Sequence, residues 1–274
     1  MTSNSNLVDR HSREIAAGER FRFGENWARF LAVVNDERIR AAEQSLRDML
    51  GVSTLAGRTV LDVGSGSGLF SLAARRLGAR VFSFDYDPQS VECTQELKRR
   101  YFLNDPQWEV QRGSVLDPDY LAQLGSFDIV YSWGVLHHTG DMYGACRNVV
   151  PRVAAGGQLF IALYNDQGAT SSYWLWVKRV YNSGRAGRFL MAAFHAPYLV
   201  GVRWLVRAAT GRRTVERGMT LWRDMFDWLG GYPFEVSKPE EILRFFRERG
   251  FELENLRTCG GRMGCNEFVF RRKA

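Results

Sequence analysis

The stretch Val60-Leu61-Asp62-Val63-Gly64-Ser65-Gly66-Ser67-Gly68 decides the fold. An apolar strand pattern runs directly into a turn with three glycines. Glycine lets a ligand approach the backbone closely and lets the following helix begin tightly against the strand. A dinucleotide site requires G-x-G-x-x-G, but position 69 is leucine and the third glycine comes early, at Gly68. The turn therefore predicts a nucleotide-like ligand, with a nicotinamide cofactor as the less favoured alternative.

Strand and helix patterns alternate on both sides of this turn. The expected strands are Thr59–Val63, Arg80–Phe84, Trp108–Arg112, Asp128–Tyr131 and Gly157–Leu163. The expected helices between them are Leu69–Leu77, Ser90–Leu103, Pro118–Leu124 and Met142–Val150. Such alternation predicts an α/β protein with a parallel sheet and crossover helices.

The chain end carries a different pattern. Ser237, with Glu240 three residues on, predicts a capping box that begins a helix at about Pro239–Arg249. Two strands, Glu252–Thr258 and Asn266–Arg271, then flank a glycine-containing turn. They predict an antiparallel hairpin that closes the sheet.

Two segments lie outside the alternation. Residues around Ile15–Leu50 have helical spacing. The stretch Tyr164–Phe234 holds five of the eight tryptophans and predicts a helical insertion, whose apolar run Phe189–Val202 is shorter than the roughly 20 residues of a membrane span. We expect a single domain with an N-terminal helical lid (1–58), a ligand-binding core (59–163), a helical insertion that caps the substrate (164–234), and a final helix and hairpin (235–274).

Composition indicates an ordinary globular protein, with 45% hydrophobic and 24% charged residues among 274. The net charge of +7 is concentrated in Ser171–Arg217, which holds nine Lys or Arg and one acid. The first twenty residues lack an apolar signal core, so a cytoplasmic location is expected. The four cysteines form no C-x-x-C pair, so neither a metal site nor disulfides are predicted.

An acid ends the second strand pattern, Val81-Phe82-Ser83-Phe84-Asp85. Asp85 stands about 20 residues beyond the glycine turn, where nucleotide-binding α/β folds place the carboxylate that accepts ribose hydroxyls. Here the sequence resembles the class I S-adenosylmethionine-dependent methyltransferases, whose first motif matches Asp62–Gly68 and whose ribose acid matches Asp85. The resemblance implies a Rossmann-like, seven-stranded, mostly parallel sheet with a C-terminal antiparallel hairpin, a helical insertion after the fifth strand, and S-adenosyl-L-methionine as cofactor.

Further motifs follow in family order. Gly113–Asp117 stands where the family contacts adenine, and Phe127–His138 is similar to the fourth motif of the ubiquinone- and menaquinone-biosynthesis branch, in which Val-Leu-His-His follows the fourth strand. The cofactor-binding residues expected from the resemblance are Asp62, Gly64, Ser65, Gly66, Gly68, Asp85, Tyr86, Ser114, Val115, Ser132 and Trp133.

The candidate catalytic residues are the histidine pair, His137 and His138, and Asp227. Histidine suits general-base work because its unperturbed pKa is about 6.5. Asp224 and Asp227 are three residues apart, so on a helix they would share one side. Candidate substrate contacts are Trp27, in a segment that could fold over the cofactor, and Trp228 and Tyr232 in the insertion; Arg262, Cys265 and Asn266 in the hairpin are weaker candidates.

The acceptor is expected to be a small organic molecule. Enzymes that methylate base amines carry Asn or Asp, two prolines and an aromatic residue after the fourth strand, where this chain has Tyr131-Ser132-Trp133-Gly134. The paired glutamates of protein arginine methyltransferases are also missing. Two alternatives stay open: methylation of RNA or another macromolecule through the basic insertion, and a non-catalytic cofactor-binding protein. The insertion could also contact a membrane surface, and the oligomeric state is not readable.

Overall fold

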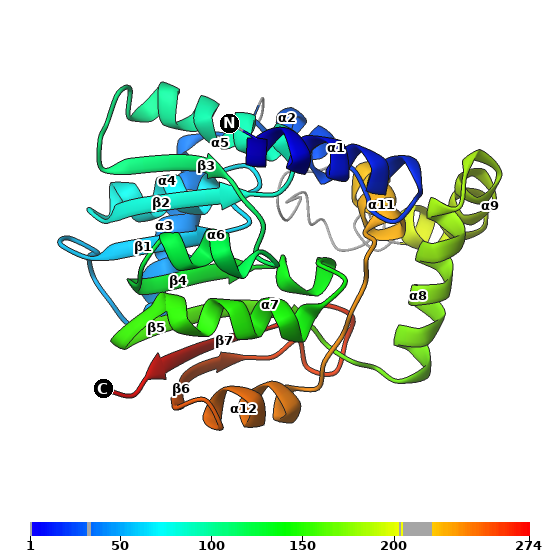
Figure 1. Cartoon of the computed structure of the whole chain (residues 1–274). Helices are drawn as coiled ribbons and strands as arrows, with labels where there is room; N and C mark the ends of the chain where they lie inside the picture. Colours follow the sequence, from blue (N-terminus) through cyan, green and yellow to red (C-terminus); the bar gives the residue numbers. More distant parts are fainter. Residues whose placement is uncertain (1, 32–33, 203, 205–220) are drawn as a thin grey trace.

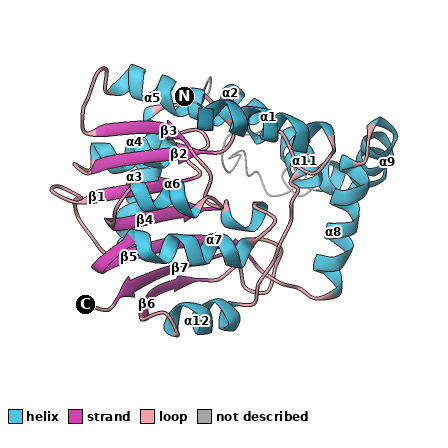
Figure 2. Cartoon of the chain, viewed as in Figure 1, coloured by secondary structure: helices cyan, strands magenta, loops and turns pink. Residues whose placement is uncertain are grey.

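The computed structural model describes residues 2–31, 34–202, 204 and 221–274. Seven strands form one sheet in the order β3-β2-β1-β4-β5-β7-β6 (Figures 1 and 2). The strands are β1 (Thr59–Val63), β2 (Arg80–Asp85), β3 (Trp108–Arg112), β4 (Phe127–Trp133), β5 (Val153–Tyr164), β6 (Phe251–Arg257) and β7 (Cys265–Arg272). Strands β1 to β5 pair in parallel, whereas β7 pairs antiparallel with both β5 and β6. The predicted mostly parallel sheet with a closing hairpin is confirmed.

Helices cover both faces of the sheet. They are α1 (Thr2–Ala16), α2 (Phe23–Phe30), α3 (Asp36–Leu50), α4 (Leu69–Arg76), α5 (Pro88–Tyr101), α6 (Pro118–Gln123), η1 (Leu136–His138), α7 (Met142–Val149), η2 (Val150–Arg152), α8 (Ala169–Asn182), α9 (Arg185–Ala196), η3 (Pro197–Val202), α11 (Leu221–Gly230) and α12 (Pro239–Arg247). Apolar side chains of α3, α4 and α5 form the core on one face, and those of α6, α7 and α12 form it on the other. Because both faces are covered, the central strands are buried almost throughout.

The expected capping box of α12 is displaced by one residue. Lys238, not Ser237, is the N-cap residue, and its backbone N–H donates to the Glu241 carboxylate at 3.2 Å. Ser237 is held elsewhere, because its N–H donates to the carbonyl of Tyr164 and its carbonyl accepts from Asp166. This bridge to the end of β5 prevents Ser237 from beginning the helix.

The insertion is helical over its described residues, as predicted. Helices α8, α9 and α11, with the π-helical η3, share a separate apolar cluster that includes Trp174, Met225 and Leu229. In Figure 1 these helices lie beyond the carboxyl ends of the parallel strands, with α9 farthest from the sheet. Within the described ranges, no helix is both long and apolar enough to cross a membrane.

Candidate cofactor and acceptor site

The glycine turn lies at the carboxyl edge of the sheet, where ligands of open α/β folds bind. The N–H groups of Gly64 and Ser65 both donate to the carbonyl of Phe84, at 2.9 and 3.0 Å, so the turn is attached to β2. Gly68 has φ +80°, and a Cβ there would lie 2.8 Å from the Cα of Thr94. A side chain at this position would therefore separate α4 from α5.

Asp85 connects the turn to the end of β2. One carboxylate oxygen accepts from the Gly66 N–H and the other from the Asp87 N–H, each at 2.9 Å. Burial raises the pKa of Asp85 to about 6, against the lowering effect of these two hydrogen bonds. The structure thus places the predicted ribose acid against the predicted glycine turn.

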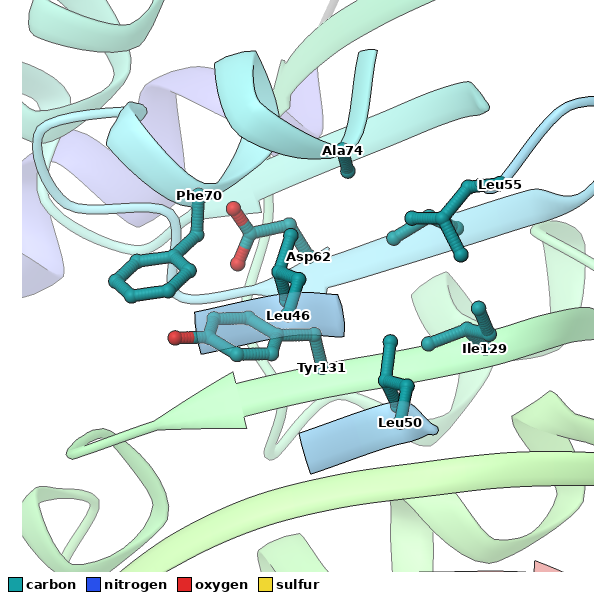
Figure 3. Close-up of a pocket in the computed structure, with 9 residues that line it drawn as sticks. Leu46, Leu50, Leu55, Asp62, Phe70, Ala74, Ile129 and Tyr131 are labelled. Atoms are coloured by element: carbon teal, nitrogen blue, oxygen red, sulfur yellow. The ribbon is translucent and has the colours of Figure 1, made fainter. Parts of the chain in front are cut away.

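Asp62 lies beneath the turn rather than at its open side. Its carboxylate accepts from the Ser71 hydroxyl of α4, and it lines a small apolar cavity with Phe70 and Tyr131 (Figure 3). This cavity lies between the sheet and helices α3 and α4. Burial raises the pKa of Asp62 to about 7, with a further contribution from the charge of Asp85.

We expect Asp62→Asn to stabilise the fold at pH 8. A carboxyl group whose pKa is higher in the folded than in the unfolded chain contributes stability below its unfolded pKa, and that contribution is lost as the pH rises through about 7. The gain at pH 8 should be on the order of a few kcal/mol and should vanish near pH 4. Denaturant unfolding at the two pH values measures it.

Asp128→Asn is the matched control, since its carboxylate accepts from the N–H and hydroxyl of Thr59 and its pKa is lowered by these hydrogen bonds. It should destabilise at pH 8. A loss of stability for Asp62→Asn at pH 8 would show that the carboxylate is required in ionised form.

The N-terminal segment contacts the glycine turn and the end of β2. The Trp27 indole nitrogen lies 3.0 Å from the place that a Cβ would take on Gly66. The Gly24 N–H donates to the Asp87 carboxylate at 2.8 Å. Trp27, predicted as a substrate contact, therefore lies against the turn predicted to hold the cofactor.

Arg20 connects the N-terminal segment to Tyr86, at the end of β2, and to His138, after β4. Its guanidinium lies 4.8 Å from the centre of the Tyr86 ring and donates to the carbonyl of His138 at 3.2 Å. Its other hydrogen bond goes to Glu14 at 2.8 Å. Sequence reasoning missed Arg20 because its partners are distant in the chain. Asp87 could have been found, since Asp directly before Pro88 is a typical start of a helix, here α5.

Several predicted cofactor residues are engaged within the fold. The Ser132 hydroxyl donates to the Val63 carbonyl at 3.0 Å, and the Trp133 indole N–H donates to Glu267 of β7 at 3.0 Å. The hydroxyls of Ser65 and Thr94 are 2.9 Å apart. The remaining two predicted residues lie in the turn after β3: the Ser114 hydroxyl accepts from the Leu116 N–H, and Val115 is buried in the core.

The histidine pair follows β4 in η1, and both rings are buried. The Tyr164 backbone N–H donates to His137 Nδ1 at 3.3 Å, so this nitrogen must carry the lone pair. His138 Nδ1 lies 2.5 Å from the Pro233 carbonyl, which can only accept, so this nitrogen must carry the proton. The two rings, 4.5 Å apart, therefore have opposite tautomers.

The Nε2 atoms of the two histidines consequently differ in their hydrogen-bonding role. His137 Nε2 is a donor, and it is buried with no hydrogen-bond partner among the described residues. His138 Nε2 is an acceptor. Burial, with the positive charge of Lys178, lowers the pKa of both rings, that of His138 to about 3. Both histidines are therefore neutral near pH 7.

The segment after α11 holds this pair in place. The Glu235 N–H donates to the His137 carbonyl at 3.0 Å, and the Glu235 carboxylate accepts from the N–H groups of Gly140 and Met142 at 3.0 to 3.1 Å. The Tyr232 carbonyl accepts from the Phe21 N–H at 2.9 Å. The predicted substrate residue Tyr232 thus connects the insertion to the N-terminal segment through its backbone.

Aromatic rings and a buried cation complete the surroundings of the pair. The Tyr164 ring lies 3.9 Å from the His137 ring and 5.9 Å from the ring of Trp228. The Lys178 ammonium, fully buried, lies 4.4 Å from the Trp228 ring centre and donates to the Trp228 carbonyl. Trp228, predicted as a substrate contact, therefore lies near the pair. The side chains of Asp224 and Asp227 lie outside the described part of the structure.

The hairpin candidates lie at the carboxyl end of β5, where Cys265 pairs with Tyr164 and Asn266 with Leu163, and Arg262 lies in the turn before β7. Asn266 is buried and bonds to Asn165 and Cys259. Where side chains are described, no group of three or more His, Cys, Asp or Glu is placed to hold a metal ion.

Comparison with known sequences identifies the core. Residues 61–159 match a family described as a methyltransferase domain. The chain is similar to the ubiquinone biosynthesis O-methyltransferase of Xanthomonas euvesicatoria pv. vesicatoria, with 26% identity over 202 residues, 74% of this chain and 66% of the relative. It is 31% identical over 119 residues to the enzyme of that name from a Methylobacterium species, covering 43% of this chain and 46% of the relative. The matches thus span about half to two thirds of the relatives' length.

Solved structures share the fold over most of the chain. An O-methyltransferase family protein from Burkholderia thailandensis aligns with a TM-score of 0.57 at 16% identity, covering 99% of this chain and 70% of that one. The N-methyltransferase NodS from Bradyrhizobium japonicum WM9, in complex with S-adenosyl-L-homocysteine, aligns with a TM-score of 0.52 at 16% identity, covering 92% and 100%. The sequence match to a methyltransferase domain thus covers the strands that carry the glycine turn and Asp85, and the solved methyltransferase structures share the fold over nearly the whole chain.

Proposed function

We propose that this protein transfers the methyl group of S-adenosylmethionine to a hydroxyl group of a small organic acceptor. The observation that carries the proposal is the pairing of two sites at one sheet edge: Asp85 with the glycine turn, and the histidine pair at the end of β4. The similarity to ubiquinone biosynthesis O-methyltransferases supports oxygen as the methylated atom.

The residues present fit the cofactor. Asp85 has two carboxylate oxygens at the turn, the arrangement that two ribose hydroxyls require. Gly66 has φ +54° and no side chain, so another group can approach its backbone closely, as the Trp27 indole does. Trp27 and Tyr86 offer flat apolar surfaces beside them. When bound, S-adenosylmethionine supplies an electrophilic methyl group, so the protein's task is mainly to orient the acceptor and exclude water.

The histidine pair is complementary to a hydroxyl group, which both donates and accepts. We infer that His138 Nε2 accepts the acceptor's O–H and takes its proton as the new O–CH₃ bond forms. His137 Nε2–H donates to the same oxygen and directs a lone pair toward the methyl group. The hydrogen bonds from Tyr164 and to Pro233 support these roles, since they set the tautomers before any ligand binds.

The aromatic surroundings favour a small acceptor. Tyr164 and Trp228 present rings beside the pair, and the lid (1–58) and cap (164–234) would enclose a molecule of limited size. The candidate base Asp227 remains a prediction. Nucleic acid is the weaker alternative, because Tyr131-Ser132-Trp133-Gly134 stands where enzymes that methylate base amines carry Asn or Asp, two prolines and an aromatic residue.

Calorimetric titration with S-adenosylmethionine, S-adenosylhomocysteine and NAD in parallel tests the cofactor. We expect binding of the first two only, because the turn lacks the dinucleotide spacing. Selective binding of NAD would overturn the proposal. Turnover is then tested with phenolic, quinol and amine acceptors; cofactor binding without methylation of any of them would favour a non-catalytic binding protein.

A further inference from the structure

The outer face of the insertion exposes large apolar side chains. Of thirteen large hydrophobic residues that are exposed in the described chain, nine lie in the insertion. Phe189 and Phe194 of α9 are 73% and 72% exposed. We call the outer face of α9 and the start of η3 the insertion face; its residues are Arg185, Arg188, Phe189, Leu190, Phe194 and Tyr198.

The opposite side of α9 already has a partner. His195 is buried, and Met191 and Ala192 pack in the apolar cluster shared with α8 and α11. The insertion face therefore carries apolar side chains beyond those that the apolar cluster of the insertion contains. Contiguous exposed apolar surface of this kind marks an interaction site.

The positive charge of the insertion indicates which kind of partner fits the insertion face. No Asp or Glu occurs between Gln167 and Val215, and Arg185 and Arg188 are exposed on the helix that carries Phe189 and Phe194. A second copy of the chain would bring these arginines against their own equivalents in a two-fold interface. Nucleic acid could use the arginines and stack on the exposed rings, but it would leave the aliphatic side chain of Leu190 in water, whereas a lipid surface would bury it.

We propose that the insertion face docks on the surface of an anionic lipid bilayer. Helices that lie in a bilayer interface combine arginine or lysine with Phe, Trp or Leu on an exposed face. Here the phenyl rings of Phe189 and Phe194 enter the acyl boundary while Arg185 and Arg188 contact lipid phosphates. The position of α9, farthest from the sheet in Figure 1, allows this contact without obstruction by the core. The proposal does not depend on the acceptor.

Vesicle co-sedimentation of the full chain tests the docking. The probes are vesicles of phosphatidylcholine alone and of phosphatidylcholine mixed with phosphatidylglycerol. We expect binding to the mixed vesicles only. Arg185→Glu with Arg188→Glu should weaken it by at least about 20-fold, from roughly fivefold for each charge removed. Phe189→Ser with Phe194→Ser should weaken it by about tenfold or more, because buried apolar area is lost.

Matched controls lie on other elements. Arg244→Glu with Arg247→Glu changes the net charge equally on α12, and Leu103→Ser removes an equally exposed apolar side chain after α5. Both should bind as wild type does, and calorimetry with S-adenosylmethionine checks that each variant is folded. Equal binding by the Phe189 and Phe194 variant would overturn the proposal. So would binding of single-stranded RNA in place of vesicles, or a dimer in light scattering that dissociates in this variant without vesicle binding.

Discussion

Replacing Asp85 by Asn is expected to weaken S-adenosylmethionine binding by roughly 100-fold or more. The carboxylate would lose the charge that strengthens two hydrogen bonds from ribose hydroxyls, each worth about 1.5–3 kcal/mol. One of its oxygens also holds the Gly66 N–H, so the turn itself would relax. Isothermal titration measures the change, and Glu109→Gln, an exposed carboxylate on neighbouring β3, is the control that should bind normally.

The pH dependence of binding gives a second test of Asp85. Its pKa of about 6 in the ligand-free protein means that the carboxylate is ionised above this pH and protonated below it. Wild-type affinity should therefore fall as the pH is lowered through about 6, while the Asn variant should be nearly independent of pH over this range. Unchanged affinity in Asp85→Asn would show that the cofactor site is elsewhere.

His138→Asn should lower kcat by about 100- to 10,000-fold, the range for loss of a general base. The Asn amide can still donate to the Pro233 carbonyl, as Nδ1 does, but nothing replaces Nε2. The substitution therefore removes the proton acceptor while retaining the hydrogen bond that positions it. Single-turnover kinetics with an acceptor found by screening measure the effect, and S-adenosylmethionine affinity should be unchanged.

His195→Asn is the matched histidine control, since His195 is buried in the insertion, where it bonds to Tyr173 and to the Met191 carbonyl. Because the base acts unprotonated and the pKa of His138 is about 3, kcat should stay constant from about pH 8 to 5. Retained turnover in His138→Asn, together with loss in His137→Asn, would reverse the two roles.

The sheet could be predicted from local pattern, whereas the end of each strand depended on its neighbours. The fifth strand was expected from Gly157, yet it begins at Val153, because pairing with Phe127 adds residues before a register shift in β4. Similarly, α1 extends back to Thr2. Helix and strand periodicities are local properties of the sequence, but the length of a strand depends on the neighbouring strand with which it pairs.

The positions of the candidate residues in the fold were predictable from the sequence, whereas the directions of their side chains were less so. Asp85 and the glycine turn were located because one strand and one turn carry them. Ser132 and Trp133 also end a strand at the correct edge, but successive strand residues point to opposite faces, and each finds a partner inside the fold. The histidine tautomers depend on Tyr164 and Pro233, which are 27 and 95 residues away.

The contacts of the N-terminal segment have a consequence for the order of events. Trp27 rests on the turn beneath the cofactor position, Arg20 reaches the carbonyl of His138, and Phe21 is tied to Tyr232. A single stretch of chain therefore contacts the glycine turn, the histidine pair and the end of the insertion. We expect that displacing this segment would expose the proposed cofactor and acceptor positions together, because the same residues contact both.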